Sequence, residues 1–151
     1  MVRKITPDDK QVYIEMSREF YSTDAVFEPV PDLYFERTFE EMMRSDVYAE
    51  AFMLEFRGEV AGYGLIAKTF SQEAGGLQVW IEELYIRPKF RSKGLGTEFF
   101  KEVERLVPAA RYRLEIEPEN EGAVRLYRRL GFSDLPYGQM IKKGEKINEY
   151  N

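Results

Sequence analysis

One stretch of the chain, residues 84–97, constrains the fold most, because it joins a strand, a proline stop, a basic loop and a glycine-opened helix. The apolar strand ends before Pro88, because proline lacks the amide hydrogen that a sheet needs. Gly94 and Gly96 then open a helix whose apolar residues, from Leu95 on, have helical spacing. Strands and helices in one continuous pattern favour a mixed α/β domain.

The periodicity of apolar residues predicts the other elements. A strand over residues 2–5 and a helix over 7–21 come first, followed by a loop and a second helix with Phe35 and Phe39 on its apolar face. The expected later elements are strands over 49–56, 60–70 and 77–86, a helix from 94 to before 108, a strand over 112–117, a helix over 120–130 and a strand over 138–142. No repeat or internal linker interrupts this order, so we expect residues 1–151 to form one domain.

The composition excludes several kinds of chemistry. The chain has no cysteine and no histidine, which removes thiolate and histidine metal sites, and we expect no metal. Proton transfer must therefore use Asp, Glu, Tyr, Lys, a chain terminus or water. A net charge of −5 argues against nucleic acid as a partner. The sequence has neither a long apolar run nor a signal-peptide pattern, so we expect a cytoplasmic protein without a membrane partner.

The glycine-containing loop has the properties of a phosphate cradle. Glycines at a helix N-terminus let backbone amides approach an anion, and the helix dipole favours that anion. The loop is not a Walker motif, and the dinucleotide-binding fingerprint fails because Phe99 stands at its third glycine position. An ordinary turn before a basic helix start remains an alternative.

Two motifs identify a family. Residues 91–96, Arg-Ser-Lys-Gly-Leu-Gly, resemble the Arg/Gln-x-x-Gly-x-Gly/Ala signature of the GNAT superfamily of N-acetyltransferases, and residues 86–88 are similar to the hydrophobic-x-Pro before it. Residues 126–132 look like the family's Leu-Tyr-x-x-x-Gly-Phe ending. The resemblance implies a mostly antiparallel mixed sheet of about six to seven strands with about four helices, splayed in the middle to hold acetyl-CoA.

The resemblance also implies where acetyl-CoA binds. The cofactor would insert between strands 77–86 and 112–117, with the backbone of Leu84 and Ile86 on the acetyl carbonyl and the pantetheine arm. Further expected contacts are the backbone amides of Arg91, Ser92, Lys93, Gly94, Leu95 and Gly96 and the hydroxyl of Thr97 on the pyrophosphate, and Asn120 and Ala123 on the pantetheine. For Ala123, a packing role is an equal alternative.

Tyr127 is the expected general acid. It matches the family position, and a neutral phenol can protonate a departing thiolate throughout the physiological pH range. The alternative is a packing role beside Val124 and Leu130. For the general base, which takes the proton of the amine, Glu82 ranks first, because the resemblance places it at the glutamate of polyamine and thialysine acetyltransferases. The other candidates, in order, are Glu115 and Glu83, and each glutamate has the alternative of a solvated or salt-bridged strand residue.

The sequence therefore predicts an N-acetyltransferase that uses acetyl-CoA. The alternatives are a catalytically silent acyl-CoA-binding or sensor domain, a protein N-terminal or lysine acetyltransferase, and an interaction module that uses the aromatic residues of 20–39. A small cationic primary amine is the expected acceptor, because acidic residues gather between and at the start of the first helices. These residues are Asp24, Glu28, Asp32 and Glu36. The chain is also compatible with a homodimer.

Overall fold

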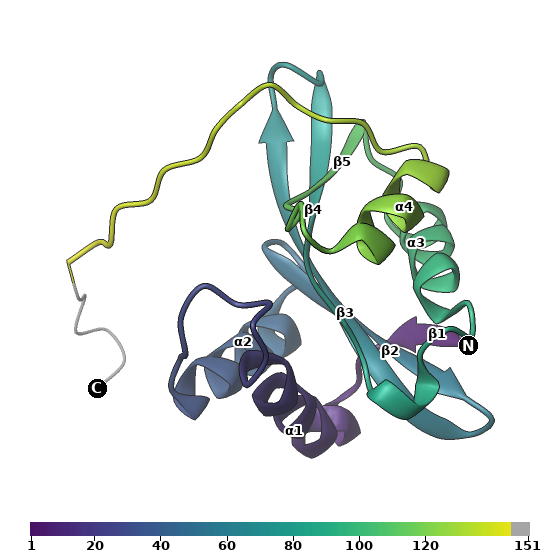
Figure 1. The fold of residues 1–151 in the computed structure, drawn as a ribbon. Coiled ribbons are helices and arrows are strands. Elements are labelled where there is room, and N and C mark those ends of the chain that lie inside the picture. The colour runs from purple at the N-terminus through teal and green to yellow at the C-terminus, as the bar shows by residue number, and fades with distance from the viewer. Residues whose placement is uncertain (146–151) are drawn as a thin grey trace.

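The sheet joins strands from both halves of the chain (Figure 1). The computed structural model describes residues 1–145. The strands are β1 (Val2–Lys4), β2 (Ala49–Phe56), β3 (Glu59–Ser71), β4 (Gly76–Ile86) and β5 (Arg111–Leu114). They follow the order β1-β2-β3-β4-β5, and every neighbouring pair is antiparallel except β4 and β5, which are parallel. The sheet is therefore mixed and mostly antiparallel, as the sequence predicts.

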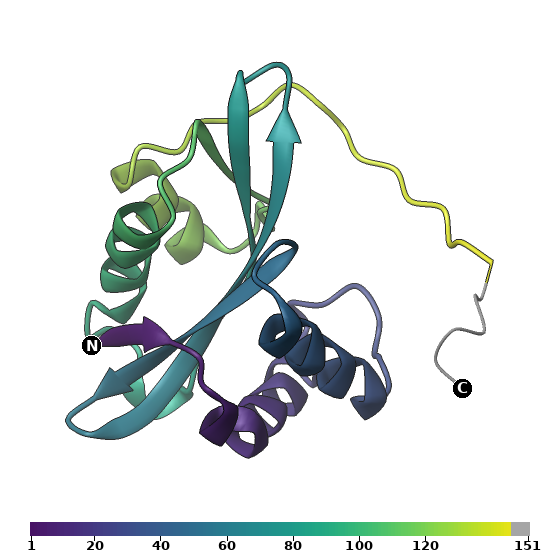
Figure 2. The same cartoon turned by 180° about the vertical axis from the view of Figure 1, so that it is seen from behind.

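Helices cover both faces of this sheet, with α1 and α2 on one face and α3 and α4 on the other (Figures 1 and 2). Their bounds are α1 (Lys10–Tyr21), α2 (Asp32–Arg44), α3 (Leu95–Leu106) and α4 (Glu121–Arg129), and single 3₁₀ turns lie at Pro7–Asp9 and Pro88–Phe90. The core is divided accordingly. One cluster joins Tyr13 and Phe39 to Tyr63 of β3, and the other joins Phe99 and Phe52 across the opposite face.

Local sequence signals determine where the last two helices begin and end. Residues 95, 99 and 103 of α3 are buried on one stripe, because their spacing matches the helical period. The Asn120 side chain caps α4 by accepting a hydrogen bond from the Ala123 amide at 3.2 Å. Gly131 follows the helix at φ 95°, a conformation that favours glycine, and the Phe132 amide donates to the Tyr127 carbonyl at 3.0 Å.

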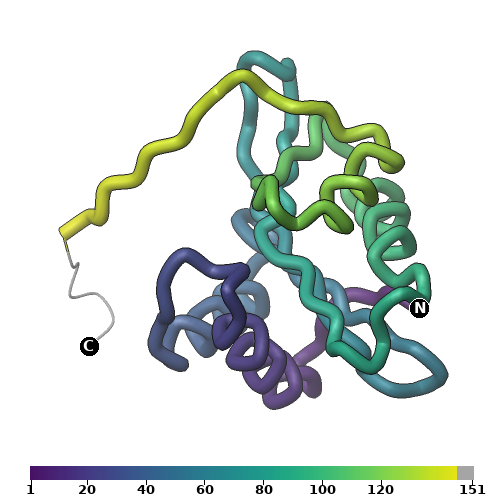
Figure 3. The backbone as a smooth tube through the Cα atoms, viewed as in Figure 1, coloured from purple at the N-terminus to yellow at the C-terminus, as the bar shows by residue number. Residues whose placement is uncertain are grey.

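The expectation of six to seven strands is wrong, because the described residues form five. The expected strand over 138–142 is absent from this part of the chain, and the expected strand over 112–117 already ends at Leu114. An extended segment becomes a strand only when a neighbour takes its backbone hydrogen bonds. Residues 133–145 instead run past the tip of the β3–β4 hairpin (Figure 3), where the Tyr137 hydroxyl donates to Glu73 at 3.0 Å.

The parallel pair β4 and β5 stays together for only part of its length. Register pairs run from Gln78 opposite Arg111 to Ile81 opposite Leu114. Beyond Ile81, β4 continues to Ile86 alongside β3, and β5 has ended. The sheet therefore opens between β4 and β5, which confirms the expected splay.

Candidate active site

Glu82 lies at the point where β4 and β5 separate. It is the first β4 residue after the last pair with β5, and a β-bulge coincides with it, since Leu65 of β3 pairs with Glu83 and the next β3 residue pairs with Ile81. Glu82 is thus the extra residue of the bulge. Bulges bend a strand and redirect a side chain, and they occur often beside active sites. The local distortion places this carboxylate at the opening of the sheet.

The rival bases Glu82 and Glu115 come together at this opening. Glu115 directly follows the last residue of β5, and the two glutamates lie at the ends of the same paired segment. Burial raises the pKa of Glu82, and the negative charge of Glu115 raises that pKa further. A carboxylate with a raised pKa is a better proton acceptor at neutral pH than an ordinary surface glutamate.

The third candidate, Glu83, faces a different environment. Its side chain is buried, and it accepts a hydrogen bond from the Tyr63 hydroxyl at 3.0 Å. Tyr63 packs edge-on against Tyr13 of α1, so this carboxylate lies on the face covered by α1 and α2. Burial raises the pKa of Glu83. The structure therefore separates Glu83 from the opening that Glu82 and Glu115 share.

The expected cradle lies at the N-terminus of α3. Ser92 and Gly94 both have left-handed backbone conformations, with φ of 60° and 78°, and the loop thereby turns into the helix. A Cβ atom added at Gly94 would meet no other atom within 4 Å, so the space beside this residue is open. The amides of Leu95, Gly96 and Thr97 belong to the first turn, where helical backbone amides lack intrahelical partners. Open space beside unpaired backbone amides at a helix N-terminus is the arrangement of an anion-binding site.

The four basic residues of this region divide into two groups. Arg87 binds Glu19 with its Nη2 at 2.9 Å, and Lys89 binds Glu59 at 2.8 Å. Arg91 and Lys93 have no carboxylate partner among residues 1–145, although the Arg91 Nε donates to the Ile86 carbonyl at 3.0 Å. Arg91 and Lys93 are therefore the cations available to a phosphate group.

Gly96 has a packing role that the sequence did not indicate. It is buried, and a Cβ atom at this position would come within 3.3 Å of Leu126 Cδ2 and 3.8 Å of Leu84 Cδ2. The glycine therefore lets α3 approach α4 and β4 closely. The Leu95 side chain is likewise buried in the core, so these two residues can offer a ligand only their backbone.

Tyr127 combines a packed ring with an unbonded hydroxyl. The ring lies edge-on to Phe100 and Phe132, with centroids 5.8 Å and 6.0 Å away. No hydrogen bond to the hydroxyl is present within the described part of the chain. Burial raises the pKa of Tyr127 above that of an ordinary phenol, so the hydroxyl keeps its proton at neutral pH. Both the packing and the catalytic interpretation are compatible with this geometry.

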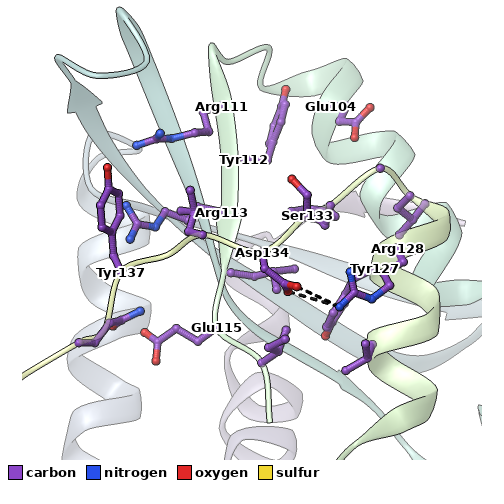
Figure 4. Close-up of a pocket in the computed structure, with 18 of the residues that line it drawn as sticks. Glu104, Arg111, Tyr112, Arg113, Glu115, Tyr127, Arg128, Ser133, Asp134 and Tyr137 are labelled. Carbon is purple, nitrogen blue, oxygen red and sulfur yellow. Dashed lines mark hydrogen bonds and ion pairs between the residues drawn. The ribbon is translucent and has the colours of Figure 1, made fainter. Parts of the chain in front are cut away.

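A pocket of about 620 Å³ lies between β5, α4 and residues 131–139 (Figure 4). Tyr127 and Glu115 both line it. Sequence reasoning missed its basic side, where Arg111 binds Glu73 at 2.7 Å and Arg113 lies over the Trp80 ring. The alternation of arginines in the strand 111–114 was a signal that could have found this side, because alternate residues share one face.

The acidic residues between and at the start of the first helices are partly neutralised. Asp32 binds Arg18 at 2.7 Å, and Glu28 binds Lys143 at 3.1 Å. Asp24 and Glu36 form no ion pair in the described residues. The free negative charge of this region is therefore smaller than the sequence suggests.

No group of three or more metal-binding side chains occurs among residues 1–145. None of the helices in this range has the length and hydropathy of a bilayer-spanning segment.

The chain matches the model of the Acetyltransferase (GNAT) family over residues 10–132. It is 32% identical over 112 residues to thialysine N-epsilon-acetyltransferase of Mus musculus and 31% identical over 101 residues to spermine/spermidine N(1)-acetyltransferase of Bacillus subtilis (strain 168). The alignments cover 64% and 62% of this chain. They span 65% and 64% of the relatives, which is just under two thirds of their length.

Solved structures share the fold. A possible acetyltransferase from Clostridium difficile 630 superposes with a TM-score of 0.80 at 15% identity. AAC(6')-Iy, in complex with the bisubstrate analogue CoA-S-monomethyl-acetylneamine, gives a TM-score of 0.78 at 16% identity. Each comparison covers 95% of this chain and 97% of the other.

Proposed function

Because the chain belongs to the acetyltransferase (GNAT) family, we propose that it transfers an acetyl group from acetyl-CoA to a primary amine. The observation that carries this proposal is the opening between β4 and β5, where Glu82 and Glu115 lie together and Tyr127 lines the adjoining pocket. One acid and one base beside an open cleft are the groups that amine acylation requires.

The cofactor would bind through its phosphates and its pantetheine arm. The amides at the start of α3, together with Arg91 and Lys93, form a positive site for the pyrophosphate, and the open space at Gly94 admits it. The β4 backbone at Leu84 and Ile86 would hold the acetyl carbonyl and the pantetheine arm, as the family resemblance implies. Asn120 and Ala123 lie at the start of α4, but the Asn120 Oδ1 already caps the helix, so we assign the pair a supporting contact.

The chemistry then follows from two side chains. Glu82 takes a proton from the ammonium group of the acceptor, and the neutral amine attacks the thioester carbonyl. The C–N bond forms, the C–S bond breaks, and the Tyr127 hydroxyl gives its proton to the departing thiolate. The acylated nitrogen then loses its second proton, which returns to the Tyr127 oxygen directly or through water. Burial raises the pKa of Tyr127, which keeps its hydroxyl protonated as a general acid must be. The raised pKa of Glu82 makes its carboxylate, when ionised, a stronger proton acceptor.

For the acceptor, we propose a small cationic primary amine. The named relatives act on thialysine and on spermine or spermidine, and Asp24 and Glu36 carry negative charges without an ion-pair partner in the described residues. A negative surface raises the local concentration of cations, an effect that salt weakens. A protein N-terminus or a lysine side chain is the alternative acceptor within the same chemistry.

The binding test compares two glycines in the same backbone conformation. Gly94 and Gly75 have φ of 78° and 76°, and a Cβ atom at either would meet nothing within 4 Å. Replacing either by valine costs about 1–2 kcal/mol of backbone strain, so both variants lose similar stability. Gly94→Val abolishes acetyl-CoA binding, measured by calorimetry, and Gly75→Val in the β3–β4 turn leaves it intact. Equal affinities in the two variants contradict the cradle assignment.

The activity test separates an enzyme from a silent acyl-CoA-binding domain. Release of CoA is followed with polyamines, aminoglycosides, lysine analogues and amino acids at low and high ionic strength. We expect a cationic acceptor to give the highest kcat/KM, with a decrease as salt increases. Binding of acetyl-CoA without turnover on any amine supports the silent domain instead.

A further inference from the structure

A carboxylate of α1 holds the end of β4 and the start of the cradle loop. Glu19, in the last turn of α1, accepts a hydrogen bond from the Tyr85 hydroxyl at 2.9 Å. It also accepts hydrogen bonds from Arg87 Nη2 at 2.9 Å and from Arg87 Nε at 3.1 Å and 3.2 Å. Tyr85 and Arg87 flank Ile86, the last residue of β4. One side chain thus binds the chain on both sides of the point where the strand ends.

The strength of this contact comes from charge and geometry together. A guanidinium that meets both oxygens of one carboxylate forms a directional pair, which fixes orientation as well as distance. The Arg87 side chain is only 25% exposed, so solvent screens the pair less than it screens most surface ion pairs. The hydrogen bond from Arg87 lowers the pKa of Glu19, with further lowering from Tyr85, so this carboxylate stays ionised at neutral pH.

The contact is continuous with the cradle. The Arg87 amide donates to the Ala61 carbonyl of β3 at 2.8 Å, and the Phe90 amide donates to the Arg87 carbonyl at 2.9 Å. The Arg91 Nε in turn donates a hydrogen bond to the Ile86 carbonyl at 3.0 Å. Residues 85–91 are therefore held by the sheet, by α1 and by their own turn, and this segment leads directly into the amides of α3.

We infer that Glu19 is a positioning residue for the acetyl-CoA site, because it holds Tyr85 and Arg87 and so fixes the direction in which the chain leaves β4 and enters the cradle. It acts through these neighbours without touching the cofactor. The inference rests on the proposed function and adds to it a residue from a helix on the opposite face of the sheet from α3.

The test measures the Kd of acetyl-CoA for Glu19→Gln and for the matched control Glu15→Gln. Glu15 lies on the same helix, but its carboxylate is 4.0 Å from Arg87 and more exposed. We expect Glu19→Gln to raise the Kd about tenfold, the effect of losing one strong charge-assisted interaction, and Glu15→Gln to change it less than twofold. The KM for acetyl-CoA rises with it, and kcat and the KM for the amine stay unchanged, a separation that general loss of folded protein does not produce.

A double-mutant cycle shows whether Glu19 acts through Arg87. If it does, adding Glu19→Gln to Arg87→Gln raises the Kd far less than Glu19→Gln does alone. If Glu19→Gln fails to fold, the same titration on Tyr85→Phe, which loses one hydrogen bond, decides: a raised Kd supports the inference and an unchanged Kd overturns it. A wild-type chain that does not bind acetyl-CoA overturns the proposed function and the inference together. If the wild-type chain binds acetyl-CoA and folded Glu19→Gln has the same Kd, the inference alone is overturned.

Discussion

Replacing Tyr127 by phenylalanine separates the two interpretations of this residue. The variant keeps the aromatic ring between Phe100 and Phe132 and removes only the hydroxyl. In the described residues that hydroxyl has no hydrogen-bond partner, so its loss leaves no other group unpaired. We therefore expect the free energy of unfolding to change by less than about 0.5 kcal/mol.

The effect on turnover is expected to be much larger. General acid catalysis contributes about 10² to 10⁴ to a rate, so kcat should fall by about 100-fold or more. A 100-fold decrease corresponds to about 2.7 kcal/mol of transition-state stabilisation. The Kd of acetyl-CoA should stay within a few-fold, because the hydroxyl acts on the leaving thiolate. Burial raises the pKa of Tyr127, and an acid must be protonated to act, so wild-type kcat should decrease with rising pH only above the usual phenol range.

The assay benefits from the composition. The chain contains no cysteine, so a thiol reagent reports the CoA released by turnover without reacting with the protein. Calorimetry gives the Kd, and thermal unfolding gives the stability. Tyr112→Phe is the control, because the Tyr112 hydroxyl donates to the Val107 carbonyl at 2.9 Å and its loss should cost about 1 kcal/mol of stability with little change in kcat. An unchanged kcat in Tyr127→Phe refutes the acid assignment and returns this tyrosine to packing.

Three further predictions concern the base and the stability of the fold. Glu115→Gln removes a negative charge that raises the pKa of Glu82, so the acid limb of kcat/KM should move to lower pH; loss of activity at every pH would identify Glu115 as the base. Gly64→Ala should destabilise the fold by about 3 kcal/mol in thermal or denaturant unfolding, because the new Cβ would lie 2.2 Å from the buried ring of Phe99; an unchanged midpoint contradicts this packing. Asp9 accepts two hydrogen bonds from the β1 guanidinium at 2.8 Å and 2.9 Å, which lower its pKa, so its contribution is present above the ordinary Asp pKa of about 4 and is lost as pH falls through the lower folded value. Asp9→Asn should therefore cost about 2 kcal/mol near pH 7 and progressively less as pH falls through the lowered folded pKa, and a cost that does not change with pH would contradict the linkage.

The helical parts of the site were predictable because their signals are local. The spacing of Leu95, Phe99 and Val103 predicts α3, and the cap at Asn120 and the glycine at 131 predict the ends of α4. Helical hydrogen bonds connect residues four apart, so a short window of sequence contains most of what decides such an element. The same window places Gly94 directly before α3 and Gly96 in its first turn.

The expected strand over 138–142 shows the limit of local patterns. Its residues favour an extended chain, but Met140 is 99% exposed and no partner strand lies beside this segment in the described structure. Strand formation depends on a neighbour that the segment itself does not contain. The ion pairs of Glu28 and Asp32 were hidden for the same reason, since their partners Lys143 and Arg18 lie elsewhere in the chain.

The sequence by itself determined which groups can carry chemistry: without histidine or cysteine, Asp, Glu, Tyr, Lys, a chain terminus or water remain for proton transfer. Only the tertiary structure decided which of them meet. Glu82 and Glu115 come together because β4 and β5 pair in parallel up to Ile81 and Leu114, and the bulge at Glu82 exists because β3 skips that residue. Register and bulges result from competition among all possible strand pairings, so they depend on segments far apart in the chain and leave no signal in the strand itself.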